Sequence, residues 1–230
     1  MSLPVALVTA SGQGLGRAIA EHLATRYFVV GSYRSSAESA EALERAHPGR
    51  LKMLEADLSE PEARARLVEA ARKEGDLAVL VNCLGVYPED YIEDIDLGTF
   101  ESVLTLTCTV CFDMIRLASP HMRAGGRIVN VGDSGADRIE SRPQATPYHI
   151  AKLGVHVLTR TYAERLGPKG VTVNMVSPGF LDGSVGETPE IPLGGPTPFV
   201  DMLPAIDHLL SDAARSTSGT NLLVNGAWNL

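Results

Sequence analysis

The stretch that decides the fold is Val5–Leu23, VALVTASGQGLGRAIAEHL, where an apolar run leads into a glycine-rich turn and an amphipathic helical pattern. Gly12, Gly14 and Gly16 fall in the turn and at the start of the helical pattern. Glycine lets the backbone approach a pyrophosphate closely, and a helix amino terminus supplies free N–H donors with a favourable dipole. The glycines alone would indicate only a tight turn, but a strand, this turn and a helix in succession predict a dinucleotide-binding unit.

The rest of the chain repeats the alternation of strand-like and helix-like segments. Runs such as VLVN and RIVNV are continuous rather than alternating, which favours strands buried on both faces of a parallel sheet. Strands are expected at Leu3–Thr9, Phe28–Tyr33, Leu51–Glu55, Leu77–Val81, Arg127–Val131, Val171–Val176 and Leu222–Val224. The pattern predicts an α/β fold with a single Rossmann-like domain over residues 1–230: a doubly wound parallel sheet of about seven strands with helices on both faces.

Helices are expected between these strands, at Leu15–Thr25, Ala37–Ala46, Thr99–Met122, Pro147–Leu166 and Phe199–Leu210. A further helix is expected to open at Ser59, because Pro61 suits a first helical turn and Glu62 has the spacing of a capping box. Pro204 is expected to kink or split the last helix, since proline removes one internal hydrogen bond.

The composition restricts the class of protein. A net charge of −8 argues against a general affinity for nucleic acid or an anionic membrane, so the expected partner is a small molecule. No run is expected to span a bilayer, and the amino terminus lacks the features of a signal peptide, so we expect a cytoplasmic protein. Cys108 and Cys111 form a C-x-x-C, but no further Cys or His cluster completes a site. We therefore expect no metal and interpret the pair as small apolar residues one turn apart.

The end of the second strand indicates which dinucleotide binds. NAD sites place a carboxylate there for the ribose 2′-hydroxyl, whereas this chain has Tyr33 followed by Arg34. Arg34 can pair with a 2′-phosphate, and Ser35 and Ser36 can donate hydrogen bonds to it. NADP(H) is therefore the expected cofactor, and a solvated loop arginine is the alternative interpretation.

Over essentially its whole length, the chain resembles a short-chain dehydrogenase/reductase. The resemblance is carried by T-A-S-G-Q-G-L-G at Thr9–Gly16, with Ala10 for the family's first glycine, by Asp57–Leu58, by N-C-L-G at Asn82–Gly85, by Y-H-I-A-K at Tyr148–Lys152, by S-P-G at Ser177–Gly179 and by V-N-G-A-W at Val224–Trp228. It implies that the cofactor contacts Thr9, Ser11, Gly12, Gln13, Gly14, Leu15, Gly16, Tyr33, Arg34, Ser35, Asp57, Leu58, Asn82, Gly85, Tyr148, Lys152, Pro178 and Gly179. It also implies a homotetramer or homodimer formed through the two long helices.

Tyr148 and Lys152 are the expected catalytic pair. Hydride transfer to C=O or C=N needs a proton at the heteroatom, and the Tyr148 hydroxyl can give it. Lys152 lies four residues on, so both project from one helix face, and its charge is expected to lower the Tyr148 pKa from about 10. Thr107 occupies the position of the family's asparagine that anchors a relay water, and it is expected to hold that water. His149 is expected at a surface or an interface.

The family's catalytic serine, which ends the fifth strand, has no obvious counterpart. The register of Arg127–Val131 places Asp133 there, whereas counting back from Tyr148 places Ser134. We favour the strand register, because loops absorb insertions. An ionised aspartate only accepts hydrogen bonds, so it suits a substrate that presents N–H groups.

Pteridine reductases, a branch of the family, carry an aspartate at this strand end. A substrate of the pteridine or dihydrofolate type is therefore the first expectation. Two alternatives stay open: carbonyl reduction of the 3-oxoacyl or sugar type through Ser134, and NADP binding with little catalytic activity.

Overall fold

The computed structural model describes residues 3–184 and 188–229, and its strands form one seven-stranded parallel sheet in the order β3-β2-β1-β4-β5-β6-β7. The strands are β1 Val5–Val8, β2 Phe28–Tyr33, β3 Leu51–Glu55, β4 Leu77–Asn82, β5 Met122–Val131, β6 Thr172–Pro178 and β7 Asn221–Val224. The helices are α1 Gly14–Leu23, α2 Ala37–Ala46, α3 Pro61–Glu74, α4 Leu97–Leu104, α5 Val110–Ala118, α6 Thr146–Leu166 and α7 Phe199–Leu210. Short 3₁₀ turns lie at Ile92–Asp94, Ser119–His121, Gly167–Lys169 and Asp212–Ala214, and a π-helical turn, Thr105–Thr109, joins α4 to α5.

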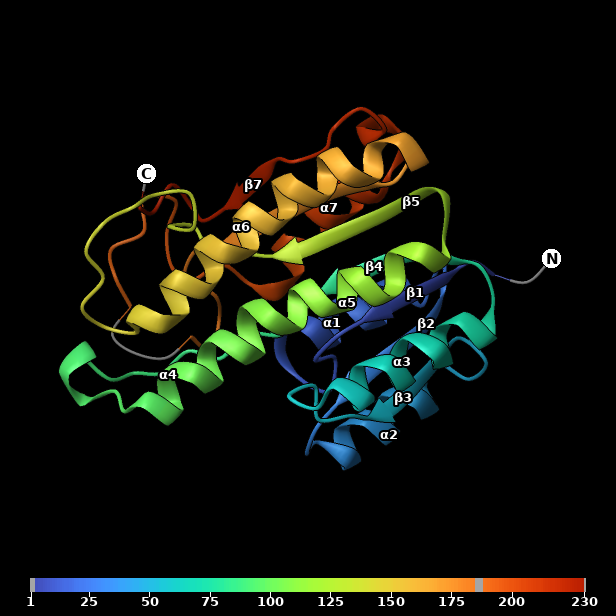
Figure 1. Ribbon diagram of the computed structural model, residues 1–230, viewed down its shortest axis with the longest axis horizontal. Helices are drawn as coiled ribbons and strands as arrows, with labels where there is room; N and C mark the ends of the chain where they lie inside the picture. The colour runs from blue at the N-terminus through green and yellow to red at the C-terminus, as the bar shows by residue number, and fades with distance from the viewer. Residues whose placement is uncertain (1–2, 185–187, 230) are drawn as a thin grey trace.

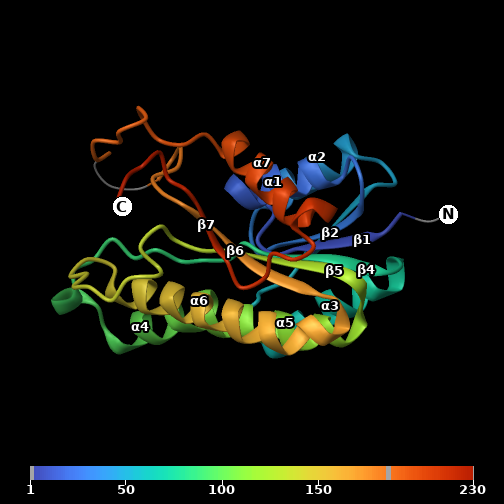
Figure 2. The ribbon, with the colours of Figure 1, turned by 90° about the horizontal axis from the view of Figure 1, so that it is seen from above.

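Helices cover both faces of the sheet, as the sequence predicts. Figure 2 shows α1, α2 and α7 on one face and α3, α4, α5 and α6 on the other. In β1, Val5 and Leu7 pack into the core under α3, α5 and α6, whereas Ala6 and Val8 pack into the core under α1, α2 and α7. A strand with apolar neighbours on both faces needs an unbroken apolar sequence, which explains the continuous runs.

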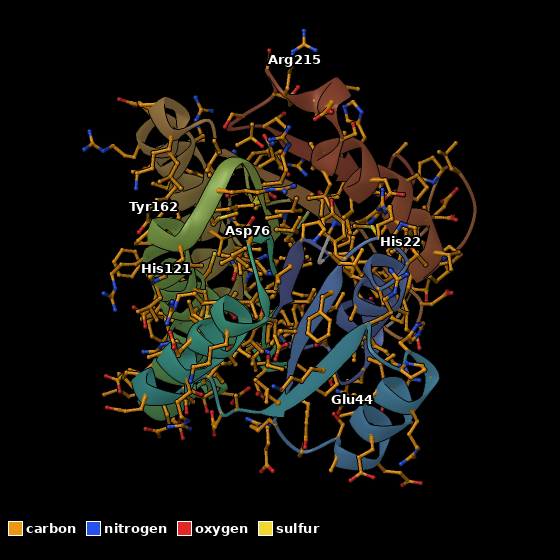
Figure 3. All side chains as sticks on the ribbon, turned by 90° about the vertical axis from the view of Figure 1, so that its right-hand side faces the viewer. His22, Glu44, Asp76, His121, Tyr162 and Arg215 are labelled. Atoms are coloured by element: carbon orange, nitrogen blue, oxygen red, sulfur yellow. The ribbon has the colours of Figure 1, made fainter. Side chains whose placement is uncertain are left out.

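The topology places the site at the carboxyl ends of the strands. The chain order reverses between β1 and β4, and ligands of such sheets bind at this switch point, beyond the strand ends. In Figure 1 the long loops that follow β4, β5 and β6 gather at this end of the molecule. Figure 3 views the opposite end, where Asp76 and His121 directly precede β4 and β5 and Arg215 lies shortly before β7.

Two details of the predicted elements are wrong, at the starts of α3 and β5. The helix α3 begins at Pro61 with Glu60 as its N-cap, and no side chain caps it. Ser59 does not form the capping box, because its hydroxyl donates to Asp57 Oδ1 at 2.7 Å instead. The helix α7 continues through Pro204, so the proline does not split it, and a kink there stays a prediction. The strand β5 begins five residues before Arg127, because a register shift against β4 accommodates the intervening residues.

The predicted helix Thr99–Met122 is helical over most of its length but is not one regular α-helix. The π-helical turn at Thr105–Thr109 interrupts it, and π turns often lie at functional sites. The helical run Leu97–His121 is also long and apolar enough to cross a membrane, so the expectation that no segment could do so is wrong by length and composition. Half of its most apolar window is buried inside the protein, which is typical of a core helix.

Candidate functional site

The turn after β1 is shaped by close backbone contacts. A Cβ on Gly16 would lie 2.2 Å from the Ala10 carbonyl oxygen, and a Cβ on Gly12 would lie 2.1 Å from Ser36 Oγ. Gly14 has a φ of +57°, and Ala10 adopts the same left-handed region with a φ of 55°. The turn therefore keeps the backbone shape of a glycine at position 10, although the side chain there is a methyl group.

Two residues of this turn that were expected to contact the cofactor, Thr9 and Ser11, direct their hydroxyls toward other groups of the protein. The hydroxyl of Thr9 accepts a hydrogen bond from the backbone N–H of Cys83 at 2.9 Å, which ties the end of β1 to the end of β4. The hydroxyl of Ser11 is fully buried and lies 3.3 Å from the carbonyl oxygens of Val8 and Ser32. Thr9 and Ser11 thus fix the turn rather than present polar atoms to a ligand.

A cavity of about 250 Å³ opens beside this turn, at the carboxyl ends of β1, β2 and β3. It is lined by Ala10, Gly12, Gln13, Ser32, Tyr33, Arg34, Ser35, Ser36, Ala56, Asp57, Leu58, Leu84, Gly85, Val86 and Leu106. The expected residues of the second strand end and of the acid–apolar pair therefore meet in one cavity. The apolar wall of Leu84, Val86 and Leu106 was not predicted, because it combines a loop with a helix distant in sequence.

The polar rim of the cavity is held in place by local bonds. Asp57 Oδ1 accepts hydrogen bonds from the side chain and the backbone of Ser59, at 2.7 and 2.9 Å. These bonds, with a smaller contribution from the nearby charge of Arg34, hold the pKa of Asp57 below its usual range. Arg34 itself is exposed, with its guanidinium available at the lip of the cavity.

Tyr148 and Lys152 lie together near the amino end of α6. The Lys152 ammonium is 5.5 Å from the centre of the Tyr148 ring and donates to the carbonyl oxygen of Val131 at 2.7 Å. A Cβ on Gly85 would lie 3.2 Å from Lys152 Nζ and 3.7 Å from Tyr148 Cε2, so the loop after β4 passes directly over the pair.

The predicted direction of the Tyr148 pKa shift is wrong. Burial, then the negative charge of Asp133, raise the pKa of Tyr148 well above its ordinary value of 10. Burial also lowers the pKa of Lys152. The favourable charge of the lysine is therefore outweighed, and the phenol is held in its protonated form.

Asp133 and Ser134 occupy different environments. The Asp133 side chain is 21% exposed and lies close enough to Tyr148 and Lys152 for its charge to raise the pKa of both. Ser134 is 1% exposed, and its hydroxyl has no hydrogen-bond partner among the described residues. Its backbone N–H donates to the carbonyl oxygen of Pro178 at 3.0 Å. Of the two residues, Asp133 is the one whose charge reaches Tyr148, whereas the Ser134 hydroxyl is buried.

The loop after β5 folds back onto the loop after β4. Gln144 donates through Nε2 to the carbonyl oxygen of Glu89 at 2.8 Å, and the Ala145 N–H donates to that of Asp90 at 3.0 Å. This contact brings Tyr87 to Tyr148, with ring centres 5.0 Å apart and the rings edge to face.

His149 and Arg142 belong to the same cluster, so the partly exposed His149 also lies beside the expected catalytic residues. His149 Nδ1 is 4.0 Å from Asp133 Oδ1, and its side chain is 19% exposed. Burial lowers the pKa of His149, while the charge of Asp133 opposes that shift. The guanidinium of Arg142 passes so close to Gly135 that a Cβ there would lie 2.4 Å from Nη2. The position of His149 directly after Tyr148 was the only signal in the sequence.

Three other expected parts of the site make hydrogen bonds within the protein: Thr107, Asn82 and the Pro178–Gly179 turn. Thr107 is buried in the π-helical turn, and its hydroxyl accepts from the Val86 N–H at 3.1 Å, so the relay-water role stays a prediction. The amide of Asn82 donates to Asn130 Oδ1 at 2.8 Å, inside the sheet rather than in the cavity lining. The turn at Pro178–Gly179 is anchored to β7 by the bond from the Gly179 N–H to the carbonyl oxygen of Val224 at 3.2 Å.

These features fit a bound dinucleotide. A Cβ on Gly12 or Gly16 would clash with its neighbours, α1 begins at Gly14 with Leu15 following, and the adjoining cavity is lined at its edge by the exposed cation Arg34. A parallel doubly wound sheet, this cradle and a Tyr–Lys pair together define a nucleotide-dependent oxidoreductase.

Comparison with known proteins gives the family. The family described as "Enoyl-(Acyl carrier protein) reductase" matches residues 9–229. The 3-oxoacyl-[acyl-carrier-protein] reductase FabG of Haemophilus influenzae is 31% identical, with 96% of each chain covered. A dehydrogenase/reductase from Sinorhizobium meliloti 1021 superposes with a TM-score of 0.91 at 28% identity, covering 100% of this chain and 96% of the other. A short-chain dehydrogenase from Burkholderia cenocepacia J2315, solved in complex with NADP, superposes with a TM-score of 0.90 at 27% identity, covering 97% and 96%. The chain belongs to the short-chain dehydrogenase/reductase family.

Proposed function

We propose that this protein is an NADPH-dependent reductase that acts on a C=N or C=O bond of a small polar substrate, with a pteridine or dihydrofolate type as the first candidate. One observation carries the proposal: the Asp133 carboxylate lies 4.0 Å from His149 Nδ1, and its charge reaches the neighbouring Tyr148, at the position where the strand register expects the family's serine. A carboxylate accepts hydrogen bonds but donates none, so it favours a substrate that presents N–H groups and disfavours a developing oxyanion.

NADPH, when bound, would supply the hydride. The protein would supply the proton from the Tyr148 hydroxyl, whose raised pKa keeps it protonated until the substrate heteroatom accepts it. Asp133 would accept a hydrogen bond from the substrate N–H. Its carboxylate is oriented by the hydrogen bond that Oδ1 accepts from the Gly135 N–H at 2.8 Å. Tyr87, 40% exposed beside Tyr148, offers a ring face for a planar substrate.

Preference for NADPH over NADH rests on the end of β2. Tyr33 and Arg34 line the cavity, and no carboxylate follows the strand there to repel a 2′-phosphate. The NADP complex of the Burkholderia relative supports this preference.

A 3-oxoacyl thioester is the second candidate, favoured by the 31% identity to a 3-oxoacyl-[acyl-carrier-protein] reductase. In this case the substrate oxygen would need a hydroxyl donor beside Tyr148. Ser134 could act only if its buried side chain turned toward the site, because its hydroxyl is inaccessible in the present arrangement.

The test is NADPH oxidation, followed by absorbance, with dihydrobiopterin and with a 3-oxoacyl thioester in parallel. Pterin-dependent oxidation that is lost in Asp133→Ala and kept in Ser134→Ala would support the first candidate. Asp133→Ser restores the residue type usual for the family, so it should lower pterin reduction and raise ketone reduction. Thioester reduction lost only in Ser134→Ala would replace the first candidate by the second. Tight NADPH binding without turnover of either substrate would favour a binding protein with little catalytic activity.

We propose that the protein assembles through the exposed apolar side chains of α5 and α6. Phe112 on α5 and Ile150 and Val157 on α6 are 41%, 47% and 57% exposed, which suits a homodimer or homotetramer formed through these helices. Sedimentation of the wild type and of Val157→Asp tests this, because a buried aspartate would shift the protein toward the monomer. A cytoplasmic location remains a prediction from the sequence.

A further inference from the structure

A buried arginine connects the cavity lining to the neighbouring helix α5. Arg64 lies in the first turns of α3 with 7% of its side chain exposed, and its Nε donates to Asp113 Oδ2 at 2.6 Å. Its Nη1 donates to two consecutive carbonyl oxygens, those of Leu58 at 2.7 Å and Ser59 at 3.1 Å. One guanidinium therefore joins α5 to the turn that precedes α3.

The ion pair is built to hold Arg64 in one orientation. Burial alone would raise the pKa of Asp113, but the hydrogen bonds from Arg64 and Arg116 outweigh burial and lower it. Arg116 binds the other carboxylate oxygen, Oδ1, at 2.8 Å, so both oxygens of Asp113 are engaged. A buried ion pair is weak evidence of a stabilising role, since apolar residues of similar volume often serve stability equally well. The arrangement instead fixes the direction of the guanidinium fork.

The turn held by Arg64 forms part of the cavity wall. Asp57 and Leu58 line the cavity, and Ser59 fixes the Asp57 carboxylate through its backbone N–H and its hydroxyl. The order of contacts is thus Asp113 to Arg64, Arg64 to the Leu58 and Ser59 carbonyls, and Ser59 to Asp57. Displacing Arg64 would release both carbonyls and move the carboxylate at the rim.

We propose that Arg64 is a positioning residue for the nucleotide: it locks the Asp57–Ser59 turn in the shape that receives the adenosine half of the dinucleotide. This rests on the proposed NADPH site. Neither Arg64 nor Asp113 touches the ligand in this role, and both act through the backbone of the turn.

Binding of adenosine 2′,5′-bisphosphate, measured by calorimetry, tests the role without any turnover. Arg64→Met should weaken binding by about tenfold, equivalent to about 1.4 kcal/mol, because the turn loses both carbonyl anchors. With NADPH the same variant should show a raised KM and a kcat near the wild-type value, since the Tyr148 site is not altered. Arg72→Met is the matched control, because Arg72 lies exposed on the same helix and its salt-bridge partner among the described residues is the partly exposed Glu69, at 2.7 Å. This control should bind like the wild type.

A double variant separates positioning from stability, because Arg64→Met alone leaves the Asp113 carboxylate buried and with fewer partners. Arg64→Met with Asp113→Leu removes both charges, so it should regain thermal stability. If Arg64 positions the turn, the double variant still binds the bisphosphate about tenfold more weakly than the wild type. Arg64→Lys should restore the ion pair but only part of the affinity, because one ammonium does not reproduce the planar fork.

Wild-type affinity in the stable double variant would overturn the positioning role and leave the proposed cofactor untouched. Failure of the wild-type protein to bind either NADPH or the bisphosphate would overturn the proposed cofactor site itself, and the positioning role with it.

Discussion

Arg34 is the residue on which the choice of cofactor depends most directly. It is exposed at the lip of the cavity, and its charge reaches Asp57 across the rim. A guanidinium and a phosphate at about 4 Å attract by about 1 kcal/mol in water and about 4 kcal/mol at the effective dielectric of a protein surface. Because Arg34 is exposed and Asp57 partly offsets its charge, we expect a contribution of about 2 kcal/mol, within the range for hydrogen bonds to charged groups.

Arg34→Ala should therefore weaken NADPH binding by about thirtyfold and leave NADH binding nearly unchanged, because only NADPH carries the 2′-phosphate. Both dissociation constants can be measured by fluorescence titration of the reduced cofactors at two ionic strengths. Salt should reduce the difference between wild type and variant for NADPH alone. Arg45→Ala is the control, since Arg45 is an equally exposed cation on α2 that pairs with Glu41 at 3.3 Å, outside the cavity lining. An equal loss for both cofactors, or no loss for either, would refute the role of Arg34.

Further predictions concern the backbone and the titration of the site. Ala10→Gly should raise the melting temperature by about 2–4 °C, because glycine adopts the left-handed conformation without strain, whereas the same change at Ala163 within α6 should lower it. Gly12→Ala would place a Cβ 2.1 Å from Ser36 Oγ, so it should abolish tight NADPH binding in titrations while the protein remains folded by circular dichroism. Burial lowers the pKa of His149 from 6.5, so below that pH the unfolded chain binds more protons than the folded one, and stability should fall as the pH falls. In urea unfolding from about pH 7 to 5, His149→Gln should show a shallower loss, and an unchanged slope would contradict the assigned shift.

The fold and part of the cavity lining followed from the sequence. Apolar runs and helical periodicity are local properties, and they located all seven strands, with errors at the ends of segments such as β5 and α3. The glycine turn was predictable because the backbone conformations open to a residue depend mainly on its own side chain, and glycine has none. The choice of Asp133 over Ser134 stays a prediction, because β5 ends at Val131 and both residues lie in the loop that follows it.

The substrate side was decided by tertiary structure. His149 lies beside Asp133, and Tyr87 lies beside Tyr148, because the loops after β4 and β5 fold onto each other. The pair of Arg64 with Asp113 joins residues 49 positions apart and left no local signal.

The direction of the Tyr148 pKa shift was mispredicted for the same reason. A spacing of four residues on a helix shows that a lysine is near, but the pKa depends on burial and on every charge around the phenol. Several segments of the chain contribute to that sum, and Asp133 and Tyr87 come from two of them. The sequence by itself determined the backbone frame and the residue types available at the strand ends. Only the tertiary structure decided which charges and rings meet there, because desolvation and electrostatic effects depend on distance in space rather than along the chain.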